Sequence, residues 1–174
     1  MRRMIQKDFF DRSSVIVARD LLGKMLVREV SGKIEKYKIV ETEAYHGRED
    51  KASHAHRGKT PRNTPMFGAP STIYVYFTYG MHWMLNITCG KAGYPSAVLI
   101  RGVEGISGPA RLTKKLHIDK MLNGRMLGKA SGLWIEESPE EVSRRMIKKT
   151  PRIGVSLSGP RWSAKLLRFV LESK

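Results

Sequence analysis

The 174-residue sequence contains one cysteine, Cys89, and lacks any long run of apolar residues. A single cysteine excludes an internal disulfide and a structural zinc site built on cysteines, and it is typical of proteins in a reducing compartment. A membrane-spanning helix needs about 18 or more mostly apolar residues, so we expect none. Residues 1–8 include neither an apolar stretch nor a small-residue cleavage site, so we expect no signal peptide.

Acidic residues are also scarce, with 16 Asp and Glu against 32 Lys and Arg and a net charge of +16. An excess of this size indicates nucleic acid or another polyanion as a partner. A ribosome-associated protein and a thermophile surface are the alternatives, although thermophile surfaces are usually enriched in glutamate as well. Residues 51–103 contain no acidic residue but several basic and aromatic ones, which can contact phosphates and stack on bases. A buried sheet would also lack acids, and both interpretations can hold for opposite faces of the same strands.

Length and a hydrophobic content of 41% predict one folded domain over residues 1–174. A helix is expected from Ser13 to Leu22 with Gly23 as its stop signal, and a second should begin at residues 107–109. Residues 138–149 are compatible with a helix or with an irregular connection. The expected strands are residues 24–30, 33–43, 72–78, 83–88, 97–101, 133–135, 152–157 and 167–171.

Many strands, few helices and no alternating βαβ order indicate an α+β fold. We expect a mixed, mostly antiparallel β-sheet with a few flanking helices. Residues 47–70 are polar and rich in glycine, proline and histidine, and they predict a long basic loop. A loop of that length is unusual in a compact domain and is often functional.

Three polar side chains alternate at the end of the second expected strand. Glu41, Glu43 and Tyr45 lie two residues apart and therefore share one face. A carboxylate in that position can activate water. A lone glutamate on a strand is more often salt-bridged or solvated, so this pattern alone leaves both readings open.

Two histidines, His54 and His56, follow Asp50 in the long loop and suggest a metal site. No metal-binding spacing such as H-E-x-x-H is present, however, and we expect no metal. The loop could instead form a basic phosphate clamp with His54 facing a pocket. A metal-dependent nuclease would use Glu41, Glu43, Asp50 and His54, and it would be sensitive to chelators.

The segment from Tyr74 to Met81 combines aromatic residues with a turn signal. Tyr74 and Tyr76 share a strand face, and Tyr79 precedes Gly80 at the strand's end. An aromatic side chain at a turn tip can wedge into a base stack, whereas core packing is the more usual fate of a strand aromatic.

In their order along the chain, these motifs resemble those of alkyladenine (3-methyladenine) DNA glycosylases of the mammalian N-methylpurine type. Each motif alone is weak, but the ordered set is specific and covers nearly the whole chain. The matching segments are residues 10–28, 41–45, 60–63, 66–67, 74–81, 86–87, 99–101, 107–109, 152–154 and 162–169.

The resemblance implies a monomeric base excision repair enzyme that acts on double-stranded DNA containing alkylated or deaminated purines, and that needs no cofactor. It would flip a damaged purine out of the duplex and hydrolyse the N-glycosidic bond, leaving an abasic site. The implied roles are catalysis by Glu43 and Arg101, a base pocket of Tyr45, His54, Tyr76 and Asn86, intercalation by Tyr79, and DNA-backbone contacts by Lys59, Thr60, Arg62 and Met66. The expected location is the cytoplasm, with the nucleoid in a prokaryote, or the nucleus in a eukaryote.

No lysine occurs among the matched pocket residues, so the resemblance implies simple hydrolysis without AP-lyase activity. Lys51 and Lys59 lie in the same loop and are the candidate amines for the alternative chemistry. His46, a shorter loop after His54 and the lack of a proline in residues 165–168 depart from the family pattern. These departures leave the preferred lesion open among 3-methyladenine, hypoxanthine and etheno-adenine. A non-catalytic basic nucleic-acid binder remains the second alternative, and it would need no Glu43 in a pocket.

Overall fold

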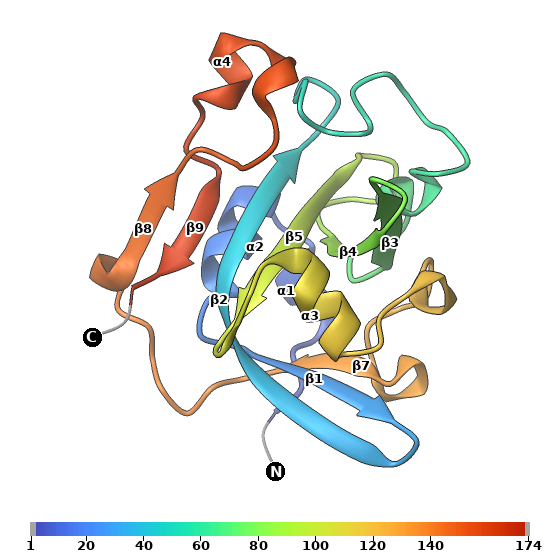
Figure 1. The fold of residues 1–174 in the computed structure, drawn as a ribbon, viewed down its shortest axis with the longest axis vertical. Coiled ribbons are helices and arrows are strands. Elements are labelled where there is room, and N and C mark those ends of the chain that lie inside the picture. The colour runs from blue at the N-terminus through green and yellow to red at the C-terminus, as the bar shows by residue number, and fades with distance from the viewer. Residues whose placement is uncertain (1–2, 173–174) are drawn as a thin grey trace.

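The computed structural model describes residues 3–172, and over this range nine strands form one sheet (Figure 1). The strands are β1 (Met25–Val30), β2 (Lys33–His46), β3 (Ile73–Thr78), β4 (His82–Thr88), β5 (Ser96–Val103), β6 (Ile106–Ser107), β7 (Leu133–Glu136), β8 (Ile147–Thr150) and β9 (Arg168–Leu171). The main path is β3-β4-β5-β2-β1-β7, with β6 on β5, β9 on β2 and β8 on β9. Every strand pair within the described range is antiparallel, and the α+β class is confirmed.

Within residues 3–172, four short α-helices and five 3₁₀-helices connect and cover the strands. The α-helices are α1 (Lys7–Phe10), α2 (Ser14–Asp20), α3 (Pro109–Lys115) and α4 (Pro160–Ser163). The 3₁₀-helices are η1 (Thr64–Phe67), η2 (Lys120–Leu122), η3 (Lys129–Ser131), η4 (Arg144–Met146) and η5 (Ser156–Ser158). Among the described residues, no helix has the length and apolar character needed to cross a membrane.

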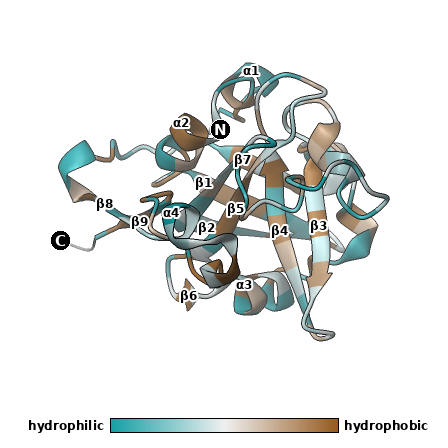
Figure 2. Cartoon of the chain, turned by 90° about the horizontal axis from the view of Figure 1, so that it is seen from above, coloured by the Kyte–Doolittle hydropathy of each residue, from teal (hydrophilic) through white to brown (hydrophobic). Residues whose placement is uncertain are grey.

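The hydrophobic core lies between the sheet and helices on both of its sides. Figure 2 shows α1 and α2 on one side of the central strands and α3 on the other. Val17 and Ala18 of α2 are fully buried, and the hydroxyl of Thr42 on β2 donates to the Ala18 carbonyl at 2.7 Å. Leu112 of α3 is also fully buried. Apolar side chains on alternate strand positions therefore meet one face of each helix.

The long strand β2 positions the residues that matter for function. It begins after a two-residue hairpin turn in which Ser31 and Gly32 have φ angles of 50° and 79°. Two consecutive left-handed residues match the twist of the flanking strands. Further along, β2 pairs with β5 on one side and with β9 on the other, so its last third is enclosed on both edges.

Most of the expected elements are confirmed, with bounds that shift by up to three residues. Helix α2 begins directly after Ser13, although the Ser13 side chain makes no capping hydrogen bond. The open segment 138–149 contains η4 and the start of β8. The strand expected over residues 152–157 is wrong. There the Ile153 amide donates to the Glu43 carboxylate instead of to a neighbouring strand, and Gly154 has a φ of 75°.

The long loop 47–70 is confirmed, and η1 is its regular part. It is held together by Asn63, which is 1% exposed. The Asn63 side-chain amide donates to the carbonyls of His54 and Gly58, and its oxygen accepts from the Thr60 amide. One buried side chain thus satisfies backbone groups from three parts of the loop, which fixes the loop without regular structure.

Candidate active site

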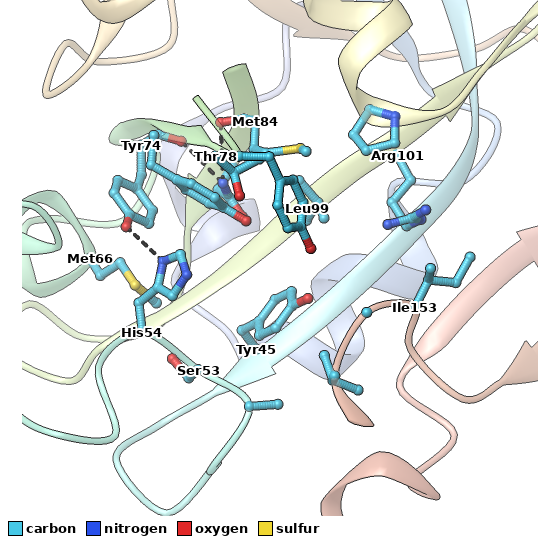
Figure 3. A pocket seen from close by; sticks show the side chains of 17 residues that line it. Tyr45, Ser53, His54, Met66, Tyr74, Thr78, Met84, Leu99, Arg101 and Ile153 are labelled. Atoms are coloured by element: carbon cyan, nitrogen blue, oxygen red, sulfur yellow. Dashed lines mark hydrogen bonds between the residues drawn. The ribbon is translucent and has the colours of Figure 1, made fainter. Parts of the chain in front are cut away.

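A cavity of about 290 Å³ lies where the end of β2, the long loop, the β3–β4 hairpin, β5 and residues 153–155 meet. In Figure 3, His54 and Met66 lie at one end of it, Arg101 and Ile153 at the other, and Tyr45 between them. All the predicted pocket residues line this cavity: Tyr45, His54, Tyr76 and Asn86, together with Met66, Tyr79 and Arg101. The structure therefore gathers side chains from positions 45 to 101 in one place.

Much of the cavity wall is aromatic, and Arg101 is the charged side chain among the described lining residues. The rings of His54 and Tyr76 meet edge to face with centroids 4.5 Å apart, and Tyr74 and Tyr76 are 5.4 Å apart. His54 Nδ1 lies 3.1 Å from the Tyr74 hydroxyl (Figure 3). Partial burial of the ring, assisted by the nearby positive charge of Arg62, lowers the pKa of His54, although the residue as a whole is exposed. Burial also raises the pKa of Tyr76 to about 12, so both rings are neutral at physiological pH.

Glu43 is completely buried and does not itself line the cavity, but both residues that hydrogen-bond to it, Tyr45 and Ile153, do. Its Oε1 accepts a hydrogen bond from the Ile153 amide at 2.7 Å, and its Oε2 accepts one from the Tyr45 hydroxyl at 2.9 Å. Burial raises the pKa of Glu43, and this effect is opposed by the charge of Arg101 and by the two hydrogen bonds. The result is an oriented carboxylate that is more basic than an exposed glutamate, which suits a general base.

Arg101 approaches Glu43 but is bound mainly by Glu41. Its Nε lies 2.9 Å from Glu41 Oε1 and 3.6 Å from Glu43 Oε1. The same Glu41 oxygen also accepts from Arg168 Nε at 2.6 Å. Sequence reasoning placed Glu41 on the correct face of β2 but did not identify this role, since it depends on β5 and β9.

A buried ion pair supports the cavity from behind. Arg152 and Asp50 make two contacts of 2.6 and 2.9 Å, and both side chains are fully buried. The guanidinium carbon of Arg152 lies 4.7 Å from the centre of the Tyr45 ring, and Nη1 donates to the Ala44 carbonyl. Neither partner was assigned this function from the sequence. The hydrophobic alternation around Arg152 suggested a strand instead.

Tyr79 lies at the tip of the β3–β4 hairpin and is 78% exposed, so it does not pack in the core. Tyr79 and Gly80 both have positive φ angles, 53° and 66°, and the Met81 amide donates to the Thr78 carbonyl. This is the geometry of a tight hairpin turn. The turn fixes the backbone at Tyr79, while the Tyr79 side chain stays exposed. Met81 beside it is 68% exposed.

The four residues expected at the DNA backbone occupy different settings. Lys59, Thr60 and Arg62 are exposed on the loop, and Arg62 donates to the Phe77 carbonyl while lying 5.3 Å from the Tyr76 ring centre. Met66 is only 3% exposed and faces the cavity. It is therefore placed to contact whatever fills the cavity.

The four residues considered for a metal-dependent nuclease are engaged separately. Glu41 binds arginines of β5 and β9, Glu43 accepts from Tyr45 and the Ile153 amide, Asp50 binds Arg152, and His54 contacts Tyr74; Arg101 lies near both glutamates. Within residues 3–172, no three His, Cys, Asp or Glu side chains are grouped as they would be around a metal ion.

Comparisons with known proteins identify the family of the chain. The family model described as methylpurine-DNA glycosylase (MPG) matches residues 8–107 and 104–174. A protein of Carboxydothermus hydrogenoformans named "Putative 3-methyladenine DNA glycosylase" is 44% identical over 172 residues, covering 88% of this chain and 89% of the relative. Relatives of the same name from Methanocella arvoryzae and Anaeromyxobacter dehalogenans (strain 2CP-C) are 42% and 44% identical, covering 90% and 94% of this chain and 86% and 81% of theirs. The chain therefore belongs to the methylpurine-DNA glycosylase family, a family of DNA-repair glycosylases.

Proposed function

We propose that the protein flips a damaged purine, such as 3-methyladenine or hypoxanthine, out of duplex DNA and hydrolyses its N-glycosidic bond. The observation that carries this proposal is the position of Glu43. Its carboxylate is fully buried, and both of its hydrogen-bond donors, Tyr45 and Ile153, line the aromatic cavity. A purine in the cavity would thus contact residues that are hydrogen-bonded directly to the Glu43 carboxylate.

The chemistry matches what such a carboxylate can do. A purine N-glycosidic bond breaks through a sugar with oxocarbenium character, as O-glycosides do. Glu43 would stabilise the developing positive charge and take a proton from the attacking water. Arg101, which also lines the cavity, would help to hold the water and the flipped nucleotide.

The cavity walls suit electron-poor bases. Alkylated purines carry positive charge, and a cation over an aromatic face gains about 0.5–2 kcal/mol. The neutral rings of Tyr45, Tyr76 and His54 add no charge that would repel such a base. Extruding a nucleotide costs a few kcal/mol, less for a damaged pair. Tyr79 would offset that cost by filling the gap left in the duplex.

Hydrolysis would proceed without a lyase step. Schiff-base chemistry requires an amine beside the reacting sugar carbon. Among the described residues that line the cavity there is no lysine, and Lys51 lies in the adjoining groove. We read Lys51 and Lys59 as phosphate contacts, since both are exposed on the basic loop. The protein would act as a monomer, in the cytoplasm of a prokaryote or the nucleus of a eukaryote.

One assay tests the proposal. Duplexes with a single hypoxanthine or 3-methyladenine are incubated with excess protein and a chelator, and abasic sites are then cleaved with alkali. Glu43→Gln should keep lesion binding and lose about 10² or more of the single-turnover rate, the scale of acid–base catalysis. Glu35→Gln, a change of a half-buried carboxylate outside the cavity on the same strand, is the matched control.

Three results would count against the proposal. Near-normal excision by Glu43→Gln would show that Glu43 is not the general base. Chelator-sensitive strand cleavage would favour a nuclease. A protein–DNA adduct trapped by borohydride, and lost when Lys51 or Lys59 is changed, would establish a lyase.

A further inference from the structure

Glu41 is the second carboxylate of the site, and it lies on the same face of β2 as Glu43. Its side chain is 11% exposed. One oxygen, Oε1, receives Arg101 Nε at 2.9 Å and Arg168 Nε at 2.6 Å. These two arginines come from β5 and β9, the strands on either side of β2. Glu41 thus joins three strands at the edge of the cavity.

A β-bulge gives Arg101 its unusual position. Glu41 pairs with Gly102, but the next residue, Thr42, pairs with Ile100. One step along β2 therefore corresponds to two steps along β5, and Arg101 is the extra residue. Bulges of this kind redirect a side chain and are frequent beside active sites.

Gly102 supplies the space for the Glu41 carboxylate. A Cβ atom added to Gly102 would lie 3.3 Å from Glu41 Oε2 and 3.4 Å from the Glu41 Cβ. Both distances are at or below ordinary van der Waals contact. The backbone of the bulge therefore approaches Glu41 closely, and this brings the neighbouring Arg101 within reach.

The charges around Glu43 explain why this arrangement matters. The groups that face Glu43 are Tyr45 on β2, Tyr76 on β3, Arg101 on β5 and Arg152, while Arg168 is its register partner on β9. Arg101 Nε is already 3.6 Å from Glu43. If Glu41 did not hold it, the guanidinium could move from this long ion-pair distance into hydrogen-bond contact with Glu43. A carboxylate in such a pair is a weaker base.

We propose that Glu41 is a positioning residue that anchors Arg101 through Nε, which holds Arg101 at 3.6 Å from Glu43 instead of in hydrogen-bond contact with it, and leaves the Nη groups of Arg101 for the cavity. The inference rests on the proposed function, because it concerns the same base. It concerns a different residue, Glu41, and predicts a different experimental result, since Glu41 would act only through Arg101.

Glu41→Gln tests the inference, because it removes the charge and keeps the shape. Single-turnover excision should fall between about tenfold and a hundredfold, as expected when a catalytic group is misplaced by up to about 1 Å. The acidic limb of the pH profile should move to lower pH, because Arg101 would approach Glu43 and lower its pKa. Glu35→Gln on the same strand should change neither property, and Glu41→Asp should restore part of the rate.

A double-mutant cycle separates this role from a structural one. In an Arg101→Met background, Glu41→Gln should cause no further loss of rate, since its effect passes through Arg101. Additive losses, or an unchanged rate and pH profile in folded Glu41→Gln, would overturn the inference. If Glu41→Gln does not melt cooperatively, Glu41→Asp is tested in the same cycle. Full activity of Glu43→Gln would instead show that the proposed mechanism itself is wrong.

Discussion

The ion pair of Asp50 and Arg152 offers the sharpest test of how the site is held. Both side chains are fully buried, and Asp50 accepts from both Nη1 and Nη2 of Arg152. Nε of Arg152 has no hydrogen-bond partner among the described residues. Asp50 is therefore the group that balances a buried positive charge, and the Ala44 carbonyl supplies the one other acceptor.

Asp50→Asn keeps the size of the side chain but leaves the Arg152 charge uncompensated. Removing one partner of a buried ion pair costs about 3–5 kcal/mol. A chain of this length loses about 2–4 °C of melting temperature per kcal/mol, so we expect a fall of about 6–20 °C. The cause is the buried guanidinium, which would lose the negative charge of its partner while staying out of contact with water.

Thermal unfolding followed by calorimetry measures the effect directly. Glu35→Gln breaks exposed contacts with Lys33 and Lys115, which contribute little because solvent screens them, so it should leave the melting temperature nearly unchanged. If Asp50→Asn lowers the melting temperature no more than this control, the pair does not stabilise the fold. The reasoning from burial would then be refuted.

Two further predictions concern the cavity and the hairpin tip. Tyr45→Phe keeps the ring but removes a hydrogen bond that lowers the pKa of Glu43. That pKa should therefore rise in the variant. Activity is lost on the acidic limb of the single-turnover pH profile as the carboxylate gains a proton, so this limb should move to higher pH. An unmoved limb would contradict the role of the Tyr45 hydroxyl. Tyr79→Ala should weaken binding to lesion duplexes more than to undamaged DNA, because only the flipped complex needs the wedge. Met121→Ala, a change at a similarly exposed apolar residue, should affect neither in a gel-shift assay, and equal losses for Tyr79→Ala would argue against intercalation.

The parts of the site that could be predicted are those in which neighbours in sequence are neighbours in space. The two-residue period of a strand predicted that Glu41, Glu43 and Tyr45 share one face. In the structure they lie on β2, and the Tyr45 hydroxyl donates to Glu43. The signal of an aromatic residue before Gly80 predicted the hairpin tip, where Tyr79 is exposed. In these cases local geometry alone determines the direction of the side chain.

The other contacts depend on long-range pairing that no local pattern encodes. Glu43 accepts from an amide 110 residues further along the chain, and Asp50 binds an arginine 102 residues away. The sequence around that arginine predicted a strand, but the Ile153 amide donates to Glu43, and Gly154 has a φ of 75°, outside the range of a strand. The bulge at Arg101 likewise cannot be predicted from the local sequence, because it depends on the register between β2 and β5.

This division has a chemical consequence. Glu43 is more basic than an ordinary glutamate because burial raises its pKa, and part of what surrounds it comes from residues 152–155 at the far end of the chain. In an unfolded chain the same carboxylate would be solvated and would return to an ordinary pKa. The residue identity is thus specified locally, on one strand face, whereas its reactivity exists only when the loop, β2, β5 and the C-terminal segment have come together. A change in Asp50 or Glu41, neither of which needs to touch a substrate, should therefore alter the chemistry at Glu43.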